Sequence, residues 1–345
     1  MKLGIIGCPG SGTLTVFEAL TQTVSQPSGK SEMRVGTLRV PDARVDILSD
    51  MYHPRKTIYA QIEYLLPGNT PTTKKDAGKE ASSWSQVRDC DAIIHVVRNF
   101  IGSGGEAPQP SSDFEAIDQE MILSDLVAVE KRLERMENDK KRGKKTDAEE
   151  QTLLQQCRRR LENETPLRKF PEIASAPVLR GFAFMSAKPV LVLFNNMDDD
   201  DALPDIPSIT SRETCMVIKA KLEQELIQMS DEEARDFLTE FNITASAMDR
   251  VIQQSYTLLG LISFFTVGED EVRAWTIQKG TSALDAAEVI HSDIKKGFIR
   301  AEVLSYADLL AAGSQAEAKK RGTFRLEGKT YEVQDGDIIN FRFNV

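Results

Sequence analysis

The chain has 345 residues, a formal net charge of −10, 41% hydrophobic residues and 28% charged residues. This composition is typical of a soluble globular protein, and no apolar run approaches the roughly 18 residues that span a membrane, which excludes an integral membrane protein. The acidic balance disfavours general adhesion to nucleic acid, although local basic patches can still contact phosphate. The length predicts more than one domain, and the short apolar start MKLGIIG is not a signal peptide, so we expect a cytoplasmic protein.

The first half of the chain predicts an α/β fold with a mostly parallel sheet. Residues 3–7 form an apolar run, a Gly/Pro/Ser cluster follows, and residues 14–20 carry apolar residues at helical spacing. Residues 37–42 and 57–66 alternate as strands do. Residues 91–97 and 190–196 are continuous aliphatic runs, as expected of strands buried on both faces of a parallel sheet.

A helical hairpin is predicted between the last two of these strands, over residues 116–165. Apolar residues step by four and three, and a glycine interrupts the pattern at a basic tip. The tip consists of Lys140, Lys141, Arg142, Lys144 and Lys145. It is either a solvated turn or a contact for RNA phosphate.

The end of the chain predicts a separate small α/β module. Residues 271–345 combine strand-like runs, a helix near residues 283–291, and turn signals at residues 327–329 and 334–336. We therefore expect a nucleotide-binding domain over residues 1–115 and 166–270, the hairpin inserted at 116–165, and a C-terminal domain at 271–345.

Residues 7–15, GCPGSGTLT, match part of a phosphate-binding loop. Such a loop has the pattern G-x-x-x-x-G-K-[ST], in which backbone N–H groups hold phosphates, the lysine contacts the β- and γ-phosphates, and the hydroxyl binds Mg²⁺. Here Thr13 replaces the lysine and Leu14 replaces the hydroxyl, and Thr15 lies about 100° further around a helix. The backbone of residues 10–15 lines any phosphate site, and the alternative is a purely structural turn. The candidate residues are Gly10, Ser11, Gly12, Thr13, Leu14 and Thr15.

Together these segments resemble the Obg-like ATPases of the YchF type, a branch of the translation-factor-related P-loop GTPases. The resemblance rests on residues 36–46 (GTLRVPDARVD), 185–198 (MSAKPVLVLFNNMD) and the C-terminal segments EVRAWTIQKGT, HSDIKKGFIRAEV and YEVQDGDIINFRFNV. It implies a Ras-like domain, an inserted coiled-coil hairpin, a β-grasp TGS domain at the C-terminus, and a ribosome or another RNA–protein complex as partner.

The resemblance also implies a base-recognition element at residues 195–198, where the family has N-x-x-E. Asn195 matches directly, Asn196 follows it, and Asp198 stands where the family has glutamate. The family pattern favours ATP over GTP, but aspartate is also the residue that reads guanine, so GTP remains an alternative. Without the family context this segment is simply an acidic loop.

Three contacts to magnesium or the γ-phosphate are expected to be missing. Besides the changes in the phosphate loop, Leu66 stands where the family's D-x-A-G aspartate is expected, and residues 26–34 lack a recognisable threonine-bearing switch. Efficient hydrolysis and Mg²⁺ binding are therefore doubtful, because phosphoryl transfer depends on neutralising the phosphate charge.

Three functions remain open at this point. The first is a regulatory protein that binds ATP or GTP weakly, with little or no hydrolysis. The second is a pseudo-NTPase scaffold that binds its partners without nucleotide. The third is an active ATPase whose lysine comes from elsewhere, for instance Lys30 or Lys74. His95 lies within an apolar strand and is expected to be a core residue rather than a catalyst.

Overall fold

The computed structural model describes residues 1–23, 33–68, 81–102, 104–230, 233 and 247–344. These residues form two compact units, residues 1–37 with 63–248 and residues 38–62 with 249–345. The second unit thus includes residues 38–62 and 249–270, which the sequence had led us to place with the nucleotide-binding domain. Among the described residues, no helix is both long enough and apolar enough to cross a membrane.

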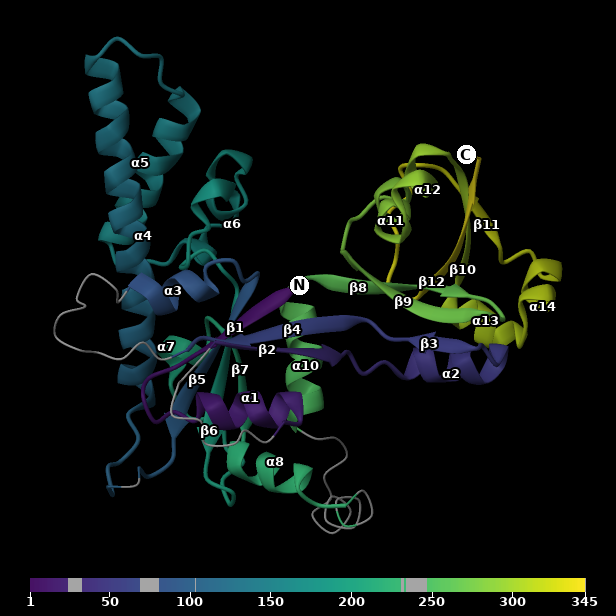
Figure 1. The fold of residues 1–345 in the computed structure, drawn as a ribbon, viewed down its shortest axis with the longest axis horizontal. Coiled ribbons are helices and arrows are strands. Elements are labelled where there is room, and N and C mark those ends of the chain that lie inside the picture. The colour runs from purple at the N-terminus through teal and green to yellow at the C-terminus, as the bar shows by residue number, and fades with distance from the viewer. Residues whose placement is uncertain (24–32, 69–80, 103, 231–232, 234–246, 345) are drawn as a thin grey trace. The chain divides into compact units, whose positions relative to one another are not determined.

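The first unit is built around a six-stranded sheet with the order β2-β4-β1-β5-β6-β7 (Figure 1). The strands are β1 (Lys2–Ile6), β2 (Arg34–Arg39), β4 (Gln61–Leu66), β5 (Ala92–Asn99), β6 (Val190–Asn196) and β7 (Thr214–Ile218). The β1–β4, β1–β5, β5–β6 and β6–β7 pairs are all parallel, which confirms the predicted α/β class. Every residue of β6 is buried, as its continuous aliphatic run predicted.

Helices pack around this sheet. They are α1 (Thr13–Thr21), α3 (Ala81–Val87), α4 (Pro110–Lys141), α5 (Ala148–Glu162), α6 (Pro171–Ala174), α7 (Pro207–Thr210) and α8 (Ala220–Ile227), with 3₁₀ turns η1 (Leu167–Lys169) and η2 (Pro177–Phe182). Phe114 and Met121, near the start of α4, belong to the core that includes strand residues of β5 and β6.

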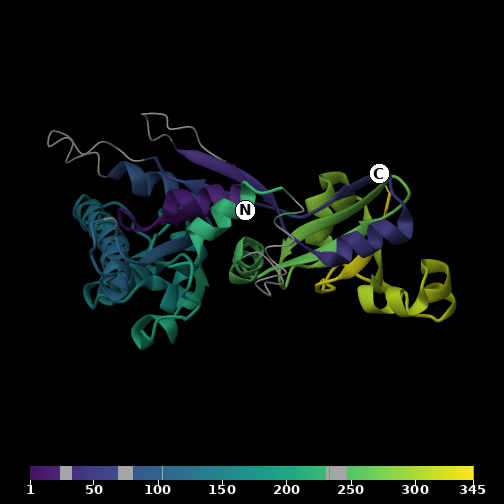
Figure 2. The same cartoon turned by 90° about the horizontal axis from the view of Figure 1, so that it is seen from below.

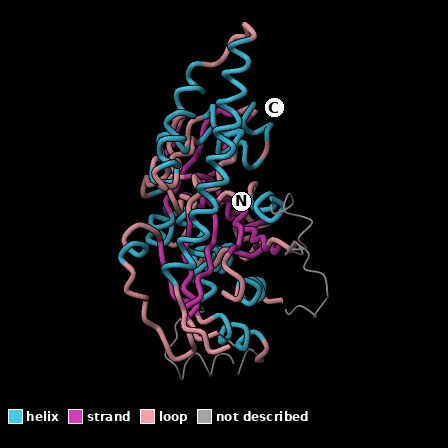
Figure 3. The backbone as a smooth tube through the Cα atoms, turned by 90° about the vertical axis from the view of Figure 1, so that its left-hand side faces the viewer, coloured by secondary structure: helices cyan, strands magenta, loops and turns pink. Residues whose placement is uncertain are grey.

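Helices α4 and α5 form an antiparallel pair joined by a short loop, seen at the top of Figure 3. Val129, Leu133 and Met136 of α4 pack with Leu154 and Cys157 of α5 in one buried cluster. Asp147 caps α5 by accepting hydrogen bonds from the N–H groups of its first turn at 2.9 and 3.2 Å. The helix pair agrees with the predicted hairpin, although α4 begins six residues earlier than the sequence pattern indicated.

The second unit has its own six-stranded sheet, with the order β11-β10-β12-β8-β9-β3. Its strands are β3 (Lys56–Ile58), β8 (Leu261–Val267), β9 (Glu271–Gln278), β10 (Phe298–Ser305), β11 (Arg325–Glu327) and β12 (Asp337–Phe343). Its helices are α2 (Ala43–Tyr52), α11 (Ala283–Ile290), α12 (Ser292–Lys296), α13 (Tyr306–Ala312) and α14 (Gln315–Lys320), and α10 (Ala247–Leu258) leads into β8. Helix α2 lies against β9, as Figure 2 shows.

Residues 57–66, predicted as one strand, belong to two sheets. Residues 56–58 pair with β9 in the second unit, whereas residues 61–66 form β4 of the first. The chain changes sheets at Tyr59 and Ala60, where the carbonyl of Ala60 accepts a hydrogen bond from the N–H of Val40 at 2.8 Å. The alternating side chains continue through the break, so their pattern alone could not reveal it.

Candidate phosphate-binding site

The glycine loop between β1 and α1 has a backbone that requires glycine at two places. Gly10 and Gly12 have φ values of 81° and 92°, a region that side chains rarely adopt. The N–H of Ser11 donates to the carbonyl of Cys8 at 3.0 Å, which closes the turn. A Cβ atom at Gly12 would lie 2.5 Å from Nδ2 of Asn195. The loop is therefore shaped by backbone geometry that the glycine spacing had indicated.

The first turn of α1 offers unused hydrogen-bond donors. The N–H of Val16 donates to the carbonyl of Gly12 at 2.9 Å. Within the described parts of the chain, the N–H groups of Thr13, Leu14 and Thr15 donate to no acceptor, and Gly12 caps the helix without a side-chain hydrogen bond. Free N–H groups at a helix N-terminus, together with the helix dipole, favour an anion. The backbone part of a phosphate site is thus present.

Asn195 fixes the loop to the end of β6. Its Nδ2 donates to the carbonyl of Ser11 at 3.0 Å, and its Oδ1 accepts from the N–H of Ala220 at 3.1 Å. The side chain is only 5% exposed. Its oxygen and one N–H are therefore engaged by the protein, and at most one N–H remains for a base. The hydrogen bond from Ala220 was not predicted, because Ala220 follows strand β7 whereas Asn195 lies on β6.

Asn196 and Asp198 differ in their surroundings. The amide of Asn196 donates to the carbonyls of Asp200 and Ala202 at 3.2 and 2.9 Å and accepts from Nδ2 of Asn99 at 2.9 Å. Asn196 could therefore donate to a base only by breaking one of these bonds, whereas its oxygen could still accept one more. Asp198 is exposed. Base recognition by these residues remains a prediction.

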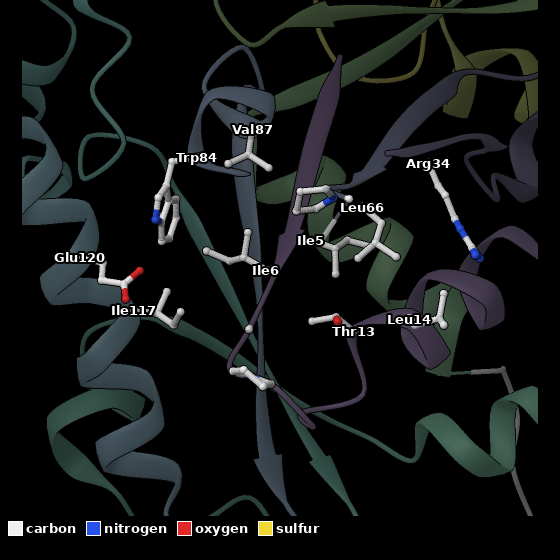
Figure 4. Close-up of a pocket in the computed structure, with 14 residues that line it drawn as sticks. Ile5, Ile6, Thr13, Leu14, Arg34, Leu66, Trp84, Val87, Ile117 and Glu120 are labelled. Atoms are coloured by element: carbon white, nitrogen blue, oxygen red, sulfur yellow. The ribbon is translucent and has the colours of Figure 1, made fainter. Parts of the chain in front are cut away.

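A pocket of about 330 Å³ lies beside the first turn of α1, and Figure 4 shows the side chains that line it. Most are apolar, and the polar ones in reach are Thr13, Arg34 and Glu120. The lining residues are Ile5, Ile6, Gly7, Pro9, Thr13, Leu14, Arg34, Leu66, Pro67, Gly68, Trp84, Val87, Ile117 and Glu120. The contributions of α3 and α4, namely Trp84, Ile117 and Glu120, could not be found from the motif because those helices are distant in sequence.

Two of these lining residues stand where the resemblance expects ligands of magnesium. Leu14 is 43% exposed, and Leu66 lines the pocket, whereas its neighbour Leu65 is buried in the core. Neither leucine has a side-chain atom that can bind a cation. Among the described residues, no three or more His, Cys, Asp or Glu side chains lie close enough together to hold a metal.

Two buried polar groups near the loop lack partners. The hydroxyl of Ser11 is buried and makes no hydrogen bond within the described structure, and neither ring nitrogen of His95 makes one. His95 is fully buried on β5 and stacks on Phe114 at 5.2 Å between ring centroids. Burial lowers the pKa of His95 to about 3, helped by the nearby positive charge of Arg168. The ring is therefore neutral at physiological pH and lies within the core, as expected from the sequence, but within the described residues it lacks the hydrogen bond that was expected of a buried histidine.

The basic tip of the hairpin is exposed. Lys144 forms an ion pair with Asp139 at 2.8 Å, whereas Lys140, Lys141, Arg142 and Lys145 form none within the described regions. Lys30 and Lys74, the alternative sources of a catalytic lysine, lie outside the described residues.

The strand, the glycine loop and the helix with free N–H groups, at the carboxyl ends of the strands of a parallel sheet, form the arrangement by which α/β proteins of the P-loop and related classes bind phosphate. A family model named YchF-GTPase_C, described as "Protein of unknown function (DUF933)", matches residues 261–344. The chain is 38% identical to the ribosome-binding ATPase YchF of Bacillus subtilis, over the full length of both chains. It is 34% identical to the protein of the same name from Haemophilus ducreyi, covering 100% of this chain and 99% of that one.

A solved structure gives the same result. The structure of the YchF GTPase from Schizosaccharomyces pombe matches with a TM-score of 0.83 and 29% identity, covering 99% of this chain and 97% of that one. The chain belongs to the YchF family.

Proposed function

We propose that this chain is a purine-nucleotide-binding regulatory protein that associates with ribosomes, with weak or no nucleotide hydrolysis. One observation carries the proposal: the free N–H groups at the start of α1 are retained, while the adjoining metal positions hold Leu14 and Leu66. The relatives named as ribosome-binding ATPases support both the nucleotide and the partner.

The missing lysine weakens binding without abolishing it. A charge-assisted hydrogen bond contributes about 1.5–3 kcal/mol, so replacing the lysine with Thr13 reduces triphosphate affinity roughly 10- to 150-fold. Hydrolysis depends more strongly on these groups, because the lysine and Mg²⁺ neutralise charge that develops in the transition state. The nucleotide then acts as a ligand that is held rather than consumed.

ATP is favoured over GTP in this proposal. The support is the resemblance of residues 195–198 to the family's base-recognition element. Asp198 is exposed and available to a ligand, and Asn195 already lies against the phosphate loop. Competition between ATP and GTP for the protein tests the preference directly.

The ribosome contact is assigned to the basic hairpin tip, with RNA phosphate as the ligand. Four exposed cations of the tip have no anionic partner among the described side chains, so they can contact phosphate without breaking an ion pair. A ribosomal partner also fits a cytoplasmic location. Co-sedimentation with ribosomes should weaken when Lys140 and Lys145 are both changed to Glu. Lys131→Glu, on the same helix but away from the tip, is the matched control.

Calorimetric titration with ATP, ADP and GTP tests the nucleotide part. We expect dissociation constants in the range of about 10 μM to 1 mM and turnover no faster than in a protein-free blank. Absence of heat for all three nucleotides at millimolar concentration would overturn the proposal. Rapid ATP turnover in the presence of ribosomes would overturn the statement about hydrolysis.

A second candidate function is a scaffold that binds partners without nucleotide. It is favoured by the apolar lining of the pocket, to which Leu14, Leu66 and Trp84 contribute beside the loop. In that case ribosome binding persists while calorimetry detects no nucleotide. Changing Thr13 to Lys and Leu14 to Ser should then restore little binding unless Leu66 is also changed to Asp.

A further inference from the structure

The sheet of the second unit contains a strand that is paired along one side and open along most of the other. Strand β12 pairs with β10 from Asp337 to Phe343. With β8, its other neighbour, it shares only one pair, Ile338 with Phe265. Both strands continue beyond that pair, β12 by five residues and β8 by two. Among the described residues, β12 forms no pair with β8 beyond Ile338, so its edge on that side is unpaired from Asn340 onward.

Backbone groups along this edge face no pairing strand among the described parts of the chain. The N–H of Tyr306 donates to the carbonyl of Gly336 at 3.1 Å, which sets the alternation of the antiparallel ladder with β10. In that alternation Ile338 and Asn340 direct their backbone groups to β10, and Phe341 directs its N–H and C=O away from it. The register with β8 has ended before Phe341, so these groups are offered to an incoming strand.

A groove of about 940 Å³ follows this open edge. It is lined by the last two residues of β8 and the last six of β12, together with side chains from both faces of the sheet. The lining residues are Thr266, Val267, Glu271, Trp275, Ile290, Ile294, Glu302, Gln315, Ala316, Lys319, Gly322, Phe324, Arg325, Leu326 and residues 338–343. Lining from both faces is expected of a groove along a strand edge, since a strand added there presents side chains to both faces.

One face of the groove is apolar. Phe341 and Trp275 lie on the side of the sheet that is covered by α11, with Ile290 and Ile294 packed nearby. Phe343 follows Phe341 at a spacing of two residues, so it is on the same face, and it remains 45% exposed.

The opposite face is charged. Glu302 accepts a hydrogen bond from Asn340 at 2.9 Å and forms an ion pair with Arg342. Lys319 of α14 is exposed and forms no ion pair with any described residue. The groove as a whole contains three cations and two carboxylates, so it carries one net positive charge.

We propose that the open edge of β12 binds an extended segment of a partner protein, which adds to the sheet as a further strand. The free N–H and C=O groups select a strand, because only an extended backbone can satisfy them in sequence. Side chains of the bound segment would point alternately to the two faces of the sheet. We therefore expect a sequence in which apolar residues, which contact Trp275 and Phe343, alternate with acidic residues, which contact Lys319. This proposal does not depend on nucleotide binding.

The test uses the full-length chain with Trp84→Phe, which leaves Trp275 as the single tryptophan and a reporter of the groove. An array of ten-residue peptides that alternate Val, Leu or Phe with Asp or Glu is titrated against it. We expect saturable fluorescence changes with dissociation constants of about 10–500 μM for the best peptides. Each of these peptides has a control with the same side chains but N-methylated amides at alternate positions, which should bind at least about tenfold more weakly because ladder donors are lost.

Protein variants locate the site. Phe343→Asp should weaken binding of the best peptide about tenfold, and Ile299→Asp, at a position that is also exposed but lies outside the lining, should not. Lys319→Glu should weaken it severalfold more than Lys320→Glu, since Lys320 is already paired with Glu317 at 3.6 Å. No saturable signal from any peptide at about 1 mM would overturn the proposal. Equal binding of the N-methylated peptides would also overturn it, as would saturation by a single-stranded RNA oligonucleotide alone.

Discussion

The pocket beside α1 and the groove along β12 differ in what their backbone offers to a ligand. Beside α1 the backbone presents N–H donors only, at the positive end of a helix, which suits an anion. Along β12 it presents a donor and an acceptor from the same residue, which suits another strand. In each pocket the backbone sets the class of ligand, and the side chains then limit what is bound. Beside α1, Thr13, Leu14 and Leu66 supply neither the lysine nor the metal ligands that would balance the charge of a triphosphate.

The largest effect is expected from Gly12→Ala, which tests whether the backbone of the first pocket is as constrained as described. The substitution places Cβ 2.5 Å from Asn195 at a φ of 92° and should cost about 3 kcal/mol of unfolding free energy and abolish nucleotide binding. Gly143→Ala is the control, because φ is 76° there but no atom lies within 4 Å, and it should cost about 1 kcal/mol. Urea unfolding followed by Trp84 fluorescence in a Trp275→Phe background measures both. Equal costs would contradict the steric argument.

Asn195→Ala should have the next largest effect. It leaves the carbonyl of Ser11 and the N–H of Ala220 without their partner, which costs about 2 kcal/mol and loosens the loop. Asp198→Ala, in the same segment but exposed, should change stability by less than about 0.5 kcal/mol while weakening any purine preference. If Asn195→Ala is as stable as the wild type and binds nucleotide equally well, the hydrogen bonds from Asn195 to Ser11 and Ala220 are not needed to hold the loop.

A smaller effect is expected from His95, in the sheet beside the first pocket. Its pKa is about 3 in the folded state and near 6.5 when unfolded, so only the unfolded chain takes up a proton as the pH falls below 6.5. Stability is therefore lost on acidification, by about 1.4 kcal/mol between pH 7.5 and 5.5. His95→Phe should remove this contribution, whereas His291→Gln, at an exposed position, should leave it. Urea unfolding at both pH values measures this change. The same loss of unfolding free energy between pH 7.5 and 5.5 in wild type and His95→Phe would refute the assignment to His95.

The smallest effect concerns magnesium. Because Leu14 and Leu66 cannot bind a cation, adding about 5 mM Mg²⁺ should change the dissociation constant of ADP by less than about threefold, equivalent to about 0.6 kcal/mol. Calorimetry with and without EDTA measures the change. If Mg²⁺ lowers the dissociation constant of ADP tenfold, other residues must bind the metal. The site would then have lost less than the substitution of its metal ligands by Leu14 and Leu66 suggests.

Patterns within short stretches of sequence were enough to predict individual strands, helices and turns. The aliphatic run of β6, the glycine turn before α1 and the stepping apolar residues of α4 each reflect one periodicity or one backbone requirement. The change of sheet at Tyr59 was missed because the side-chain alternation does not stop there.

The candidate site was predictable only where it follows the chain. The glycine loop is a contiguous motif, but Trp84 and Ile117 reach the pocket from helices far away in sequence. The hydrogen bond from Ala220 to Asn195 likewise joins two strands' ends, and no local pattern encodes it. The open edge of β12 depends on where the pairing of two strands stops, which composition cannot indicate.

Helix α4 has a mechanical consequence for the first unit. Ile117 and Glu120 line the pocket, and Lys140 and Lys141 begin the basic tip of the same unbroken helix. From Glu120 to Lys141 the helix rises about 32 Å at 1.5 Å per residue. It therefore works as a lever arm, in which a tilt of about 5° moves one end by about 3 Å relative to the other. Because the helix is continuous, a change in its tilt would move the tip and the pocket wall together.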